Sequence, residues 1–113
     1  MKDSTANETL LAVDSGYTFV CDKNAAHTIT LPSVASTGLG STAPSTDRGL
    51  YYTLINANTT GATLSVIASS TQFINEYASS TPFDITVKNG RATIVCAGIT
   101  GHQWLAFVDP VTT

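Results

Sequence analysis

The chain has 113 residues, of which 42% are hydrophobic and 12% charged, and it carries a net charge of −3. This length suits one domain. The five basic residues are scattered, which argues against a nucleic-acid partner held by phosphate contacts, and no apolar run approaches the ~20 residues of a membrane span. Hydroxyl side chains replace charges, with 19 Thr and 11 Ser, so little charge repulsion separates copies of the chain.

The first nine residues are polar and precede the first apolar run. We expect residues 1–9 to form a flexible N-terminal arm and residues 10–113 to form a single domain. The start, MKDSTANETLLAV, lacks the charged-then-apolar architecture of a signal peptide, so synthesis in a cytoplasm is the expected default.

Apolar residues then alternate with hydroxyl residues in short runs, as in Thr28-Ile29-Thr30-Leu31. Period two is typical of strands with one buried and one wet face. The runs are separated by Gly, Asn and Asp, and no window has a helical stripe. The eight predicted strands are Leu10–Val13, Tyr17–Cys21, Thr28–Leu31, Tyr51–Asn56, Thr63–Ala68, Asp84–Lys88, Arg91–Ala97 and Trp104–Val108.

Two segments interrupt this rhythm. Residues 32–49 form a long Ser/Thr/Gly/Pro loop, which is either a solvated insertion or a loop ordered by a neighbouring subunit or partner. Residues 69–83 are irregular but contain apolar side chains, which either tuck under the sheets or form an interface.

Turn chemistry predicts three hairpins. Asn89-Gly90 lies between two β-branched runs, and this pair favours a type I′ turn because both central residues need positive φ. Residues 58–61 and 98–101 carry similar signals. We therefore predict an all-β fold, a jelly-roll-like β-sandwich of about eight antiparallel strands. An immunoglobulin-like sandwich is the alternative, weakened because the only Trp follows both cysteines.

No catalytic or metal site stands out. Cys21 and Cys96 each end a strand-like run and are expected to be buried free thiols, with a disulfide left open. His27 and His102 form no His-x-His pair, so a cupin-type or zinc site is not expected. There is no Gly-x-Ser-x-Gly elbow, and most of the acids lie in turns. We expect no enzyme activity and no cofactor.

The runs taken in order resemble a module of tailed-phage virion proteins, found in capsid decoration proteins, head fibres and tail fibres. The resemblance covers roughly residues 13–108. It is carried by the pattern Gly16-Tyr17-Thr18-Phe19, Thr28-Ile29-Thr30-Leu31-Pro32-Ser33, Gly49-Leu50-Tyr51-Tyr52-Thr53-Leu54-Ile55-Asn56, Gly61-Ala62-Thr63-Leu64-Ser65-Val66, Asn89-Gly90-Arg91-Ala92-Thr93-Ile94-Val95 and Gly101-His102-Gln103-Trp104-Leu105. These motifs specify architecture more than activity. The chain departs from fibre proteins because it has no long repetitive shaft.

The resemblance implies a β-sandwich, often trimeric, that docks on a shell or fibre and performs no chemistry. For this chain it implies a capsid decoration protein on the virion surface, with the major capsid protein and two further copies of itself as partners. The expected docking residues are those of the arm: Met1, Lys2, Asp3, Ser4, Thr5, Ala6, Asn7, Glu8 and Thr9. The alternative is a head- or tail-fibre tip that binds a host receptor or glycan, with Trp104, Tyr51, Tyr52 or Tyr77 stacking on sugar rings.

Overall fold

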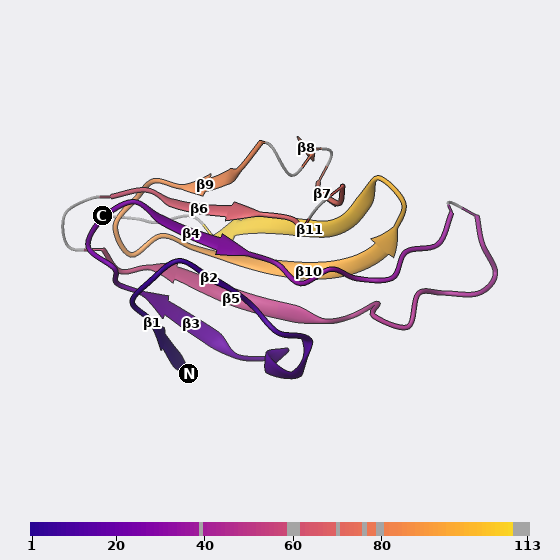
Figure 1. Cartoon of the computed structure of the whole chain (residues 1–113), viewed down its shortest axis with the longest axis horizontal. Helices are drawn as coiled ribbons and strands as arrows, with labels where there is room; N and C mark the ends of the chain where they lie inside the picture. Colours follow the sequence, from indigo (N-terminus) through magenta and orange to yellow (C-terminus); the bar gives the residue numbers. More distant parts are fainter. Residues whose placement is uncertain (39, 59–61, 70, 76, 79–80, 110–113) are drawn as a thin grey trace.

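Two β-sheets with a shared core make up the fold (Figure 1), in a computed structural model that describes residues 1–38, 40–58, 62–69, 71–75, 77–78 and 81–109. The seven-stranded sheet has the order β1 (Lys2–Ser4), β3 (Thr18–Cys21), β5 (Tyr51–Asn56), β10 (Arg91–Ile99), β11 (His102–Asp109), β7 (Phe73–Ile74) and β8 (Tyr77–Ala78). The four-stranded sheet has the order β2 (Glu8–Thr9), β4 (His27–Thr30), β6 (Leu64–Ile67) and β9 (Phe83–Ile85). A short 3₁₀ helix, η1, covers Ala12–Asp14.

The first six strands alternate between the two sheets. β1, β3 and β5 pair in parallel in one sheet, and β2, β4 and β6 pair in parallel in the other. Parallel neighbours need a crossover connection. Here each crossover passes through a strand of the opposite sheet, so the chain winds through three successive coils. From β9 onward the direction reverses, because β9 is antiparallel to β6, and β10 is antiparallel to both β5 and β11.

This winding confirms the all-β prediction but departs from the predicted antiparallel jelly roll, because the sheets are partly parallel. Asn89-Gly90 makes a turn, yet it connects β9 to β10 in different sheets instead of closing a hairpin. Of this pair only Asn89 has positive φ, at 64°. Gly90 is required for space, since a β-carbon there would lie 2.8 Å from the carbonyl oxygen of Val87.

The other two predicted hairpins have different outcomes. β10 and β11 do form a hairpin, with Gly98 at positive φ near the end of β10 and Gly101 at positive φ in the turn. β5 and β6 lie in different sheets, so residues 58–61 do not close a hairpin, and the turn itself lies partly outside the described residues. The predicted strand Leu10–Val13 is also wrong, because its last two residues enter η1.

The core lies between the sheets and is built by the alternation seen in the sequence. On β3, β5 and β10, each buried residue is followed by one that is only partly buried. Three aromatic rings lie at the centre: Tyr52 contacts Phe19 at 6.2 Å and Trp104 at 5.9 Å between ring centroids. Full burial of such side chains stabilises the fold by about 1.5–3 kcal/mol each, so this cluster is a main source of stability.

Residues 1–9 are part of the sheets, which corrects the expectation of a flexible arm. β1 pairs with β3, and β2 pairs with β4. The Ser4 side chain is fully buried, donates to Glu8 Oε2 at 2.6 Å and lies 3.1 Å from His27 Nε2. A segment of polar composition is ordered here because backbone pairing and one buried hydroxyl cluster satisfy its polar groups.

The long loop is held by the chain itself around its base. Ser45 Oγ donates to the carbonyl oxygen of Ala35, and Asp47 Oδ2 accepts from the Ala35 amide at 2.7 Å. Thr37 forms an isolated parallel bridge with Ile99, so the loop extends the sheet beside the end of β10. In Figure 1 the loop then projects beyond the β10–β11 hairpin at the right. The irregular span 69–83 contributes β7, whose Ile74 is buried beside Trp104.

Candidate functional site: the outer face of the seven-stranded sheet

The feature that the core does not explain is the face of the seven-stranded sheet that points away from the core. We call this surface the outer face, and it spans β1, β3, β5, β10 and β11. Its members are the residues that alternate with the buried ones: Asp3, Thr18, Val20, Tyr51, Thr53, Ile55, Arg91, Thr93, Val95, Leu105 and Phe107. Directly paired residues on neighbouring strands share a face, so the register arranges these side chains in rows.

Three rows cross the strands. The first runs from Asp3 on β1 through Val20 and Ile55 to Arg91 on β10, which pairs in turn with Asp109 on β11. The second is a threonine row, Thr18, Thr53 and Thr93, which ends at Phe107 on β11. The third joins Tyr51, Val95 and Leu105.

This face is unusual for a surface exposed to water. Phe107 and Tyr51 expose 57% and 47% of their surfaces, and the side chains between them are neutral. Charged residues are found instead in the first row, where Asp3 and Arg91 are both exposed and Arg91 pairs with Asp109 on β11. Apolar patches bounded by polar residues mark interaction sites, so the outer face is the strongest candidate for binding another macromolecule.

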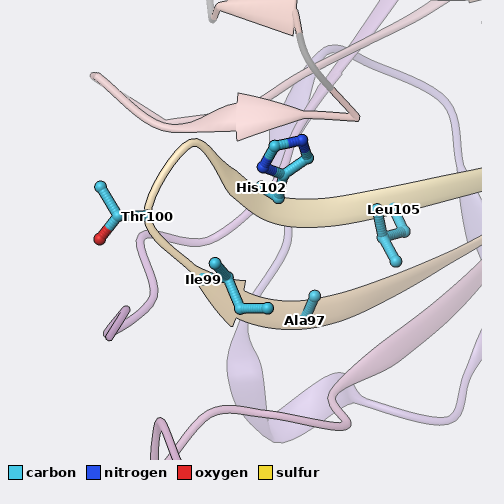
Figure 2. Close-up of a pocket in the computed structure, with 5 residues that line it drawn as sticks. All are labelled: Ala97, Ile99, Thr100, His102 and Leu105. Atoms are coloured by element: carbon cyan, nitrogen blue, oxygen red, sulfur yellow. The ribbon is translucent and has the colours of Figure 1, made fainter. Parts of the chain in front are cut away.

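A pocket opens at the hairpin end of this region (Figure 2). It has a volume of about 390 Å³ and is lined by Ala97, Ile99, Thr100, His102 and Leu105. The lining is aliphatic except for the Thr100 hydroxyl and the His102 ring. This composition suits a small ligand that has one apolar face and a group able to form a hydrogen bond. Sequence analysis missed the pocket because it depends on the register shift between Cys96 and Ile99.

The predicted sugar-stacking aromatics are divided between core and surface. Trp104 and Tyr52 are fully buried and pack on each other, so neither can stack on a glycan, and for these two residues the prediction was wrong. The Tyr52 hydroxyl donates to the carbonyl oxygen of Leu11 at 2.6 Å. Tyr51 is exposed on the outer face. The side chain of Tyr77 lies outside the described part of the chain.

Both cysteines are buried free thiols, as predicted. Burial raises the pKa of Cys21 to about 12 and that of Cys96 to about 11. Cys21 pairs with Asn56 at one end of β5, whereas the Cys96 amide donates to Leu50 just before the other end. Six strand residues at about 3.3 Å each separate these levels, so the two sulfurs are too far apart for a disulfide.

The two histidines do not come together. His27 is buried, and its Nε2 lies 2.7 Å from the carbonyl oxygen of Ala6. Because a carbonyl only accepts, Nε2 carries the proton, and the buried Nδ1 has no partner among the described atoms. His102 is exposed at the pocket. Within the described residues, no three His, Cys, Asp or Glu side chains gather closely enough to hold a metal ion.

The predicted docking residues lie at the edges of the two sheets. β1 is the outer strand of the seven-stranded sheet, and β2 is the outer strand of the other. Of residues 1–9 only Ser4 is buried. The Lys2 ammonium contacts Asp14 at 2.8 Å, and this ion pair raises the lysine pKa. Charged side chains on edge strands discourage pairing with another strand, so any docking through this segment would use side chains.

No protein-family model matches the chain, and no curated protein matches it significantly. In the described part of the chain, no helix is long and apolar enough to cross a membrane. The outer face and its pocket are the features of the molecule that indicate a function.

Proposed function

We propose that the chain is a non-enzymatic structural protein of a tailed-phage virion, a decoration protein that binds the outer surface of the head and stabilises it. The observation that carries this proposal is the outer face of a small sheet protein, which exposes Tyr51 and Phe107 and has few charged side chains. Such a surface suits binding to a protein lattice or to another copy of the chain, and the residue pattern from Gly16 to Leu105 resembles virion modules of this kind.

The proposed partners are the major capsid protein and further copies of the chain. A shell presents many equivalent sites, and linked copies bind such sites more tightly because the second contact becomes intramolecular. The low charge content favours close approach of copies, since there is little mutual repulsion. A homotrimer is the stoichiometry that the resemblance implies, and it stays a prediction.

The test is binding to head particles of the phage that encodes the chain, with copies per particle counted by quantitative electrophoresis. Thr5 is exposed between β1 and β2, so Thr5→Arg changes the predicted docking segment without touching the core. We expect saturable binding of the native chain and a clear loss for Thr5→Arg.

Thr42→Arg is the matched control, because Thr42 is also exposed but belongs to the long loop. Equal binding of Thr5→Arg and Thr42→Arg would remove the docking role of residues 1–9. Failure of the native chain to bind particles at all would reject the decoration function.

A fibre-tip module that binds a host glycan is the second candidate. The pocket at the hairpin end favours it, because Thr100 and His102 supply hydrogen-bonding groups over an aliphatic floor. The projecting loop lies against Ile99 at the same end. A glycan array separates the two candidates: selective binding that is lost in His102→Ala supports the fibre-tip function, and an empty array supports decoration.

A further inference from the structure

We propose that residues 1–9 are an end cap on the three coils, and that Lys2 and Glu8 prevent this end of the molecule from pairing with the same end of a second copy. The surface concerned is the open side of β1 in one sheet and of β2 in the other, since each is the outer strand of its sheet. Its role can be tested whether or not the chain binds head particles.

The core-facing positions of the second and third coils are apolar. Phe19 on β3 pairs with Leu54 on β5, and Ile29 on β4 pairs with Val66 on β6. All four side chains are buried in the core. Directly paired residues share a face of their sheet, so a further coil that continued this core would carry apolar residues at the same two positions.

The first coil carries charged residues at these two positions. Lys2 on β1 pairs with Phe19, and Glu8 on β2 pairs with Ile29. Both Lys2 and Glu8 are exposed. Inward-pointing charges on an outer strand oppose the addition of another strand, because a strand placed beside them would remove the charges from water.

Contacts inside the end cap satisfy the two charges and connect them to the core. The Lys2 ammonium contacts Asp14 Oδ1 at 2.8 Å, and the Glu8 carboxylate accepts from the Ser4 hydroxyl at 2.6 Å. Ser4 is fully buried and pairs with Cys21 of the second coil. A polar layer therefore lies directly on an apolar layer, as in the terminal repeats that keep stacked-repeat proteins soluble.

The backbone of β1, in contrast, is suited to accept a strand. The carbonyl oxygen of Ser4 accepts from the Asp22 amide, on the side of β3. Successive residues of a strand direct their backbone groups to opposite sides, so the N–H and C=O groups of Asp3 point to the open side. Such groups are a template for pairing with another chain. The side chains of Lys2 and Glu8 therefore keep this end unpaired.

The same end of a second copy is the occupant that this surface fits. A two-fold axis perpendicular to the sheets would place β1 beside β1 and β2 beside β2 as antiparallel neighbours, so that each sheet continues into the other copy. Such a contact closes at two copies. In the native chain it would enclose two Lys2 and two Glu8 side chains, with like charges on neighbouring strands.

The experiment is sedimentation equilibrium of the full chain and of the double variant K2V/E8V. This variant loses one positive and one negative charge, so the net charge of −3 does not change. Both new side chains continue the apolar layers of the core. The variant should associate at least about tenfold more tightly than the native chain and approach twice the native mass.

Two further variants locate the contact. D3V/T9V is the matched control, because Asp3 and Thr9 lie on the same two strands, are exposed and alternate with the core-facing positions. It should keep the native mass. Adding Asp3→Pro to K2V/E8V removes the N–H on the open side of β1 and should restore the native mass. Circular dichroism and thermal unfolding of each variant establish that it is folded.

Three results would overturn the role of Lys2 and Glu8. The first is a K2V/E8V variant that keeps the native mass up to about 1 mM protein. The second is an equal gain of association in D3V/T9V, which would mean that added apolar surface acts at any position of these strands. The third is a gain that persists after Asp3→Pro, which would place the new contact away from the open side of β1.

Discussion

The wound part, β1 to β6, and the β10–β11 hairpin hold their strands together in different ways. β10 and β11 are consecutive, antiparallel and joined by a short turn, with Gly98 near the end of β10 and Gly101 in the turn, both at positive φ. In the wound part no two neighbouring strands are consecutive, because the chain visits the other sheet between them. A hairpin is specified locally, whereas each coil must close a long connection before its strands can pair.

The corners between the sheets reflect this difference. In the wound part, polar side chains bind the backbone where the chain leaves a strand. Asn56 donates to the carbonyl oxygens of Ala62 and Ile85, at 3.0 and 2.8 Å, and accepts from Asn58 Nδ2 at 2.7 Å. Asn58 in turn accepts from the Asn24 amide at 2.6 Å, which connects the corners of two coils. The two parts therefore differ in how their connections are stabilised. The corners of the coils use buried side-chain amides that bind the backbone, whereas the hairpin uses glycines that adopt positive φ.

The largest expected effect is the loss of Asn56, which would break the corner of the wound part. Asn56→Ala removes a buried amide and leaves two carbonyl oxygens and the Asn58 amide without their partner. Because each buried unsatisfied group costs about 1–3 kcal/mol, we expect the free energy of unfolding in urea to fall by about 3 kcal/mol.

Asn7→Ala is the control in the same part of the molecule. Asn7 is exposed, and its side-chain oxygen accepts from the Thr28 amide at 2.9 Å. Water can replace that contact, so the loss should stay below about 1 kcal/mol. Equal losses for the two variants would show that the corner amides do not support the coils.

The same contrast explains how much of the fold was predictable. Hydrophobic period two located most of the strands, including Tyr51–Asn56 with both ends correct. It could not give their direction, because alternation is the same for parallel and antiparallel neighbours. The Asn-Gly signal specified a turn, but Ile85 and Arg91 on either side of it belong to different sheets. Signals carried by neighbouring residues predicted the β10–β11 hairpin correctly, but they did not predict the parallel pairing of β1 to β6.

The candidate site was less predictable than the fold. The outward residues of each strand were expected to be accessible to solvent, and Thr53 and Thr93 are partly accessible. Whether Val20, Ile55 and Phe107 form one surface depends on the register across β3, β5, β10 and β11, which no single stretch encodes. The polar first segment was expected to be a flexible arm from its composition, and its docking role came from the resemblance. Ser4 is nevertheless buried, because its hydroxyl has partners inside the fold.

A moderate effect is expected from a methyl group at Gly98, near the end of β10. Gly98 has φ of +65°, and a β-carbon there would lie 2.5 Å from Ser45 Cβ, at the base of the long loop. Gly98→Ala therefore combines backbone strain of about 1–2 kcal/mol with a displaced loop. We expect it to lower the free energy of unfolding by about 2–3 kcal/mol, measured by urea denaturation.

Gly101→Ala separates the strain from the clash. Gly101 has φ of +82°, and a β-carbon there would have no neighbour within 4 Å. Its loss should be limited to about 1 kcal/mol of strain. If Gly98→Ala were no more costly than Gly101→Ala, the loop base would not be packed against the turn, and the hairpin would be independent of residues 32–49.

The smallest effect at neutral pH, and the one that joins the two parts, concerns the thiols. Cys21 belongs to the wound part and Cys96 to the hairpin, and burial raises their pKa values to about 12 and about 11. Thiolate is the reactive form, so neither thiol should react with iodoacetamide at about pH 8 in the folded chain, and both should react in urea.

The same thiols make stability depend on pH. Unfolded thiols ionise near pH 8.5. Above that pH the unfolded state releases protons that the folded state keeps, so stability should fall as pH rises toward 11. The variant C21A/C96A should show a shallower fall, although Tyr52, with a pKa of about 12, keeps part of it. Rapid labelling of Cys21 alone in the folded chain would mean that the coils open while the hairpin stays closed, and would divide the molecule into two units of unequal stability.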